Sequence, residues 1–134
     1  MAKWIGWIAT ALIVAAAVIP LGYRVRLGRR AAPESGTIRV HVVIGLAVAV
    51  VALMHTLAVL GSLGSPDAVA AGMVAFVPGV VAFFVLFAHV GVGLRLREPR
   101  LKDRASKRRT HLATAIAIAL ATALHIVALR VAVH

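Results

Sequence analysis

Cysteine is absent from this chain of 134 residues, and carboxylates are scarce, with four Asp and Glu against fifteen Lys and Arg. The absence of cysteine excludes disulfides, thiolate metal sites, iron–sulfur clusters and the thioether attachment of a c-type haem. All four acids fall outside the long apolar runs, which argues against a proton pathway built on buried carboxylates. These acids are Glu34, Asp67, Glu98 and Asp103.

The excess of positive charge, a formal +11, raises the question of a nucleic-acid partner. Five basic residues lie in 23–40 and eight in 94–110, and the other two are Lys3 and Arg130. Both clusters fall between apolar runs, so they indicate charged loops. They do not form a basic surface of the kind that binds a nucleic-acid groove. The sequence therefore predicts no nucleic-acid partner.

Hydrophobic residues make up 62% of the chain, whereas a soluble domain is roughly half apolar. Four runs are long enough to cross a bilayer, which takes about 20 residues. In lipid such a segment has to be helical, because each backbone polar group needs an internal partner. The sequence predicts one all-α membrane domain over 1–134, a four-transmembrane-helix bundle with helices at about 4–22, 40–61, 68–93 and 111–131.

The first run also has to be considered as a secretory signal peptide. It is long enough to span, lacks a clean small-x-small cleavage site and ends in a basic segment, so we interpret it as a helix. Positive charge marks cytoplasmic loops, which places 23–40 and 94–110 inside and both termini outside. The prediction is a multi-pass protein of the cell (inner) membrane, N-out and C-out.

An internal repeat is visible at an offset of 70 residues. Arg39 and His41 align with Arg109 and His111, and His55 aligns with His125. The chain is therefore interpreted as a duplicated helical hairpin. Two hairpins of the same orientation are related by an axis along the membrane normal, which makes the second and fourth helices parallel.

Four of the six histidines form two pairs with the same spacing of fourteen residues, His41 with His55 and His111 with His125. A histidine inside a membrane span is costly and indicates function. Two heptads bring both members of a pair to one face in a left-handed bundle. The members then lie about 21 Å apart along the helix, at about 1.5 Å per residue.

Parallel second and fourth helices set His41 level with His111, and His55 level with His125. Each level then offers two imidazoles, and a neutral imidazole is a good metal ligand. A zinc site usually needs four protein ligands, whereas haem brings four nitrogens of its own and takes axial ligands from the protein. The sequence predicts two noncovalent b-type haems, with these four histidines as the iron ligands and no catalytic residue.

Two arginines precede the histidines of the cytoplasmic level by two residues, and both are candidate partners of the haem propionates. They are Arg39 and Arg109. The alternative, a positive-inside or interfacial arginine, is left open. For His89 three roles are open as well: contact with a quinone, proton relay, or a hydrogen bond to a neighbouring helix, of which the last is favoured.

These paired histidines on the second and fourth helices resemble the haem-binding core of the cytochrome b subunit of bc-type complexes. The pattern is similar, more loosely, to cytochrome b561 and ferric-reductase-like proteins. The resemblance implies axial ligation by His41, His55, His111 and His125 and electron transfer between the membrane faces. The chain has no Pro-Glu-Trp-Tyr quinol-oxidation motif and no flavin- or nicotinamide-binding domain, so the resemblance extends to the haem core and not to the terminal reactions.

The leading hypothesis is a transmembrane electron conduit, an electron-transfer protein or a subunit of a membrane oxidoreductase and not a complete enzyme. The alternatives are a membrane anchor subunit with structural haem and a small histidine-dependent transporter. Besides membrane lipid, the expected partners are a redox protein or subunit, with a quinone and self-association into an oligomer left open.

Overall fold

The computed structural model describes residues 2–132, apart from the side chains at 67, 68, 70, 71, 73 and 74. The described chain forms four α-helices and contains no strand: α1 (Ala2–Leu27), α2 (Gly36–Leu60), α3 (Pro66–Arg95) and α4 (Arg104–Ala132). Each has a segment that is long and apolar enough to cross a membrane, which in α3 is Ala75–Arg95. The protein is therefore a multi-pass, all-α membrane protein, as the sequence predicts.

The helices run past the ends of the apolar runs. Helix α1 continues to Leu27 where the sequence predicts an end near 22, and α4 begins at Arg104 where it predicts a start near 111. Hydropathy marks the hydrocarbon boundary, but Arg and Lys are good helix formers and extend a helix into the interface. In the last turn of α1, Arg24 and Arg26 also interact favourably with the helix dipole.

Local signals set the start of α2. Ser35 is its N-cap, with extended backbone angles (φ −64°, ψ 153°), and its side-chain oxygen accepts a hydrogen bond from the amide of Ile38 at 3.4 Å. This bond satisfies one of the amides that the first turn of a helix leaves free. The helix ends at Leu60, and Gly61 begins the short turn to α3.

Helix α3 is interrupted near its start. Gly72 has φ 72° and ψ 152°, a conformation that only glycine adopts readily, and the long apolar segment follows from Ala75. Pro78 lies inside the helix with no such departure from helical angles. The interruption therefore comes from the glycine and not from the proline.

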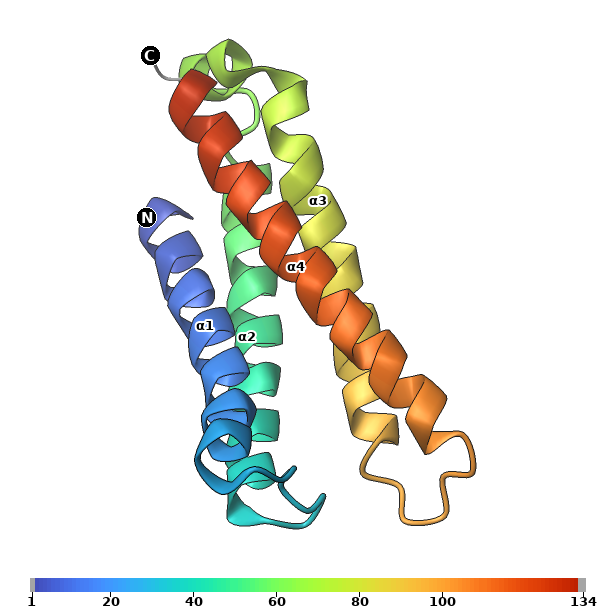
Figure 1. The fold of residues 1–134 in the computed structure, drawn as a ribbon. Helices are drawn as coiled ribbons and strands as arrows, with labels where there is room; N and C mark the ends of the chain where they lie inside the picture. The colour runs from blue at the N-terminus through green and yellow to red at the C-terminus, as the bar shows by residue number, and fades with distance from the viewer. Residues whose placement is uncertain (1, 133–134) are drawn as a thin grey trace.

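The bundle consists of two hairpins (Figure 1). Helix α1 packs along α2, α3 packs along α4, and the main contact between the hairpins is α2 against α3. The hairpins diverge toward the end that carries the basic loops 28–35 and 96–103, here named the basic end. Helices α2 and α4 both run away from this end, so they are parallel, as a duplicated hairpin requires.

The bundle interior is small and lies between the two levels of histidines. Val48, Leu86 and Ile118 are 2%, 6% and 4% exposed and pack together from α2, α3 and α4. Large apolar side chains cover the exterior instead, for example Phe84 at 67% and Leu120 at 62% exposure. An apolar exterior of this kind fits lipid as the surrounding solvent.

Candidate cofactor site

The basic-end pair, defined as His41 on α2 and His111 on α4, brings together one imidazole from each hairpin. Their ring centroids are 6.2 Å apart and their planes are 86° from parallel. With metal–nitrogen bonds of about 2 Å and ring centres roughly 1 Å further out, two imidazoles on opposite sides of one metal have centroids about 6 Å apart. The observed separation of the ring centroids would allow both imidazoles to bind one metal ion between them.

The far-end pair, His55 on α2 and His125 on α4, also faces across the hairpins. Each imidazole donates from Nδ1 to a backbone carbonyl of the neighbouring helix in its own hairpin, His55 to Ala2 O and His125 to Ala75 O. The structure brings His41 and His111 together as one level, and the pairing of His55 with His125 as iron ligands stays a prediction. The described residues contain no cluster of three or more His, Cys, Asp or Glu side chains placed to hold a metal ion, and a cofactor with its own nitrogens needs no such cluster.

Three of the four histidines are oriented by backbone carbonyls of the adjacent helix in their own hairpin. The pairs are His41 Nδ1 with Ala16 O at 2.8 Å, His55 Nδ1 with Ala2 O at 3.0 Å, and His125 Nδ1 with Ala75 O at 3.1 Å. A carbonyl can only accept, so each Nδ1 carries the hydrogen and donates it. In a neutral ring Nε2 then keeps its lone pair, which is the arrangement found in histidines that bind a metal.

Glycines on α1 and α3 make room for the imidazoles. A Cβ atom added at Gly6 would lie 3.0 Å from Cε1 of His55, and one added at Gly79 would lie 2.9 Å from Cε1 of His125. Both distances are shorter than ordinary van der Waals contact. The close approach of ring and backbone explains why glycine, a poor helix former, stands inside these spans.

The contacts reveal a sharper repeat than the sequence shows. On α1 the carbonyl of Ala2 accepts a hydrogen bond from His55, and Gly6 leaves room for its ring. On α3, Ala75 and Gly79 do the same for His125. The first and third helices therefore correspond at an offset of 73, three more than the second and fourth helices. The sequence alone misses this correspondence, because its members are backbone carbonyls and small residues.

The basic-end level departs from this repeat at two positions. One is Gly93, where an added Cβ would lie 3.1 Å from Cε1 of His111, and its counterpart on α1 is Pro20. The counterpart of Ala16 at an offset of 73 is His89, whose ring stacks on His111 with centroids 3.8 Å apart and planes 14° from parallel. His89 Nδ1 also lies 2.8 Å from Thr114 Oγ1 on α4, so it makes the interhelical hydrogen bond that the sequence favours. Nδ1 of His111 is buried and has no hydrogen-bond partner among the described residues.

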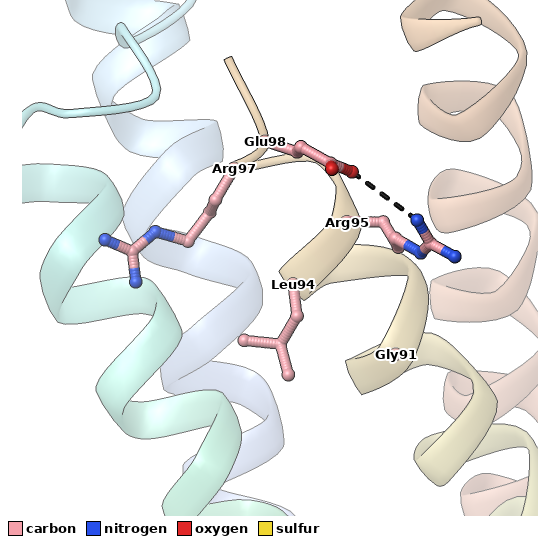
Figure 2. A pocket seen from close by; sticks show the side chains of 5 residues that line it. All are labelled: Gly91, Leu94, Arg95, Arg97 and Glu98. Carbon is pink, nitrogen blue, oxygen red and sulfur yellow. Dashed lines mark hydrogen bonds and ion pairs between the residues drawn. The ribbon is translucent and has the colours of Figure 1, made fainter. Parts of the chain in front are cut away.

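Open space lies next to Gly45 on α2 and at the end of α3. A Cβ added at Gly45, one turn beyond His41, would meet nothing within 4 Å. An open groove of about 550 Å³ lies at the end of α3, lined by Gly91, Leu94, Arg95, Arg97 and Glu98. Figure 2 shows Arg97 pointing toward the α1–α2 hairpin, while Arg95 turns toward α4 and pairs with Glu98 at 3.5 Å.

The arginines lie away from the imidazoles. Arg39 is exposed on the first turns of α2, and Arg109 is exposed at the rim of a second groove. Residues two apart on a helix point about 200° away from each other, so neither arginine shares the face of the histidine that follows it. Their role as propionate partners stays a prediction. Arg130 lies over the ring of Trp7 at 5.9 Å and links α4 to α1.

The fold and the site together define the class, a four-helix membrane protein with two levels of facing histidines. Comparisons with protein-family models, with curated proteins and with solved structures gave no match to the chain. Its resemblance to b-type cytochromes therefore depends on the histidine pattern alone.

Proposed function

We propose that the protein holds two noncovalent b-type haems and passes electrons across the membrane. The observation that carries the proposal is the 6.2 Å separation of the His41 and His111 rings, which belong to different hairpins. Its support is the hydrogen bond from Nδ1 of His41 to a backbone carbonyl, which leaves Nε2 as the ligating atom. The same arrangement recurs at His55 and His125.

Each part of the chain has a distinct task in this proposal. The four histidines bind and orient, the carbonyls of α1 and α3 hold three of the rings, and the haem iron supplies one-electron chemistry. Val48, Leu86 and Ile118 fill the space between the two levels and exclude water from it. The levels are about 21 Å apart along α2 at about 1.5 Å per residue, so they lie toward opposite sides of the hydrocarbon core.

The proposed topology places the basic end in the cytoplasm and the ends of α1 and α4 outside, by the positive-inside rule. The donor and acceptor are then a quinone, a soluble redox protein or another subunit at each face. The chain would act as an electron-transfer protein or a subunit of an oxidoreductase.

One observation favours a second candidate, a membrane anchor in which haem is structural. The two hairpins contact each other mainly through α2 and α3 and diverge at the basic end. Every proposed haem takes one ligand from α2 and one from α4, so it would fasten the hairpins together. Holding the hairpins together requires no electron transfer. A measurement of electron transfer across the membrane therefore distinguishes the two candidates.

A reduced-minus-oxidised visible spectrum of the purified protein tests haem binding. We expect low-spin b-type bands and two haems per chain, and one haem per chain in the His55→Ala variant. Leu57→Ala is the matched control, because Leu57 lies two residues further on α2 and is 58% exposed. A colourless wild-type protein would overturn the proposal.

A further inference from the structure

A second groove lies at the basic end, between the α1–α2 loop and the start of α4. It has a volume of about 280 Å³, and three of the five residues that line it are arginines: Arg30, Ala105, Arg108, Arg109 and Leu112. Arg30 comes from the loop between α1 and α2, whereas the other four come from the first turns of α4. The groove therefore gathers positive charge from both hairpins.

These arginines have no carboxylate partner in the described part of the chain. The ion pairs there join Arg95 to Glu98 and Lys107 to Asp103 at 3.5 and 3.7 Å, and neither pair involves a groove arginine. A guanidinium carries five donors in a planar fork that matches phosphate oxygens. Three such forks around one groove favour a phosphate group.

The groove continues into an apolar stripe on the lipid side of α4. Leu112, Ile116 and Leu120 follow Arg108 at intervals of four residues, so the four form a slanting stripe that turns by about 120° around the helix. The three apolar side chains are 62%, 53% and 62% exposed. Leu112 and Leu120 are about 12 Å apart along the helix at about 1.5 Å per residue, a surface that an acyl chain can follow.

We propose that this groove binds one anionic phospholipid, with its phosphate among Arg30, Arg108 and Arg109 and an acyl chain along Leu112, Ile116 and Leu120. The three arginines favour an anionic headgroup. The exposed apolar side chains on α4 favour a ligand with an acyl chain over a small soluble anion. Basic pockets at the ends of transmembrane helices commonly bind such headgroups. Ile118, which shares the interior face with His111 and His125, is 4% exposed, so the lipid stripe and the proposed haem ligands occupy different faces of α4.

The site ties the α1–α2 loop to α4, since Arg30 and Arg108 belong to different hairpins. Its test does not depend on the proposed haems, because Arg30 and Arg108 have no assigned role in binding them. Arg109 is left unchanged in the test because the sequence also predicts it as a propionate partner.

Native mass spectrometry of the purified protein with phosphatidylglycerol or phosphatidylcholine of the same chain length tests the proposal. We expect one phosphatidylglycerol to bind about tenfold more tightly than phosphatidylcholine, and the Arg30→Gln/Arg108→Gln variant to lose this preference, since two charge-assisted contacts are removed. The charge-matched control Arg26→Gln/Arg100→Gln should keep it, because neither residue lines the groove.

A third arm adds inorganic phosphate as a competitor of phosphatidylglycerol. We expect inorganic phosphate not to displace the bound phosphatidylglycerol at concentrations where added phosphatidylglycerol of a different chain length does displace it. Equal losses in the two double variants would show that net charge alone attracts lipid, and displacement by phosphate would show a small-anion site. Either result, or equal binding of the two lipids by the wild-type protein, would overturn the proposal.

Discussion

His89 and His111 stack face to face, with ring centroids 3.8 Å apart and planes 14° from parallel. His111 belongs to the basic-end pair, and its Nδ1 has no hydrogen-bond partner in the described chain, whereas Nδ1 of His41 has a carbonyl partner. The two levels of histidines are therefore not equivalent. At the basic end the ring of His89 stacks on His111 in addition to the contact that the His89 backbone makes with this imidazole, whereas backbone carbonyls alone hold the other three.

Removing the stacked ring should weaken the basic-end haem alone. Ring stacking contributes about 0.5–1.5 kcal/mol, so we expect His89→Ala to lower haem affinity at that level roughly three- to tenfold. Haem titration followed by visible spectroscopy measures this effect. His89→Phe keeps a ring to stack but not the bond to Thr114, and it should recover most of the loss. An equal loss at both levels would contradict the asymmetry.

Filling the space beside a far-end ring should disturb that level. Gly79→Ala puts a methyl group 2.9 Å from Cε1 of His125, and overpacking of this kind costs about 1–3 kcal/mol. We expect weaker far-end haem binding with the basic-end haem retained, seen as a fall toward one haem per chain. Gly22→Ala is the matched control, because a Cβ there meets nothing within 4 Å. If Gly79→Ala left the number of haems per chain unchanged, the contact between Gly79 and His125 would not position that ring.

Haem should draw the two hairpins together. The chain has no native cysteine, so spin labels attached at Val25→Cys on α1 and Leu112→Cys on α4 report one inter-hairpin distance. Both positions are exposed, at 76% and 62%. We expect electron–electron double resonance to give a shorter and narrower distance distribution with haem bound than without it. Identical distributions would argue against haem as the link between hairpins.

The contact between Trp7 and Arg130 should stabilise the opposite end of the bundle. A cation over an aromatic face contributes about 0.5–1 kcal/mol at an exposed site. We expect Trp7→Leu and Arg130→Gln each to lower the free energy of unfolding in detergent by about this amount. The double variant should cost less than the sum of the two single variants. Strict additivity would show that the pair does not interact.

The sequence predicts the helices well because the apolar runs are long and the loops are basic. It places the ends of α1 and α4 poorly, since Arg24, Arg26 and Arg104 continue a helix beyond the hydrocarbon, where hydropathy no longer marks it. It does not predict the interruption at Gly72, because backbone angles are not encoded in hydropathy.

The sequence also predicts which histidines meet, because a spacing of fourteen residues on two parallel helices fixes their levels. It does not predict what holds them. The partners of His41 and His55 are the carbonyls of Ala16 and Ala2, and every residue has a carbonyl. Only the packing of α1 against α2 selects these two, and the contact of Gly6 with His55 depends on the same packing.

The most direct test of the account is electron transfer across a sealed membrane. Haem-loaded protein is reconstituted into liposomes that contain ferricyanide, dithionite is added outside, and bleaching of the trapped oxidant is followed. We expect bleaching with wild-type protein and with Leu57→Ala, and none above protein-free liposomes with His41→Ala or His55→Ala. Haem-loaded wild-type protein that bleaches no faster than protein-free liposomes would contradict transmembrane electron transfer and would leave haem as a structural link.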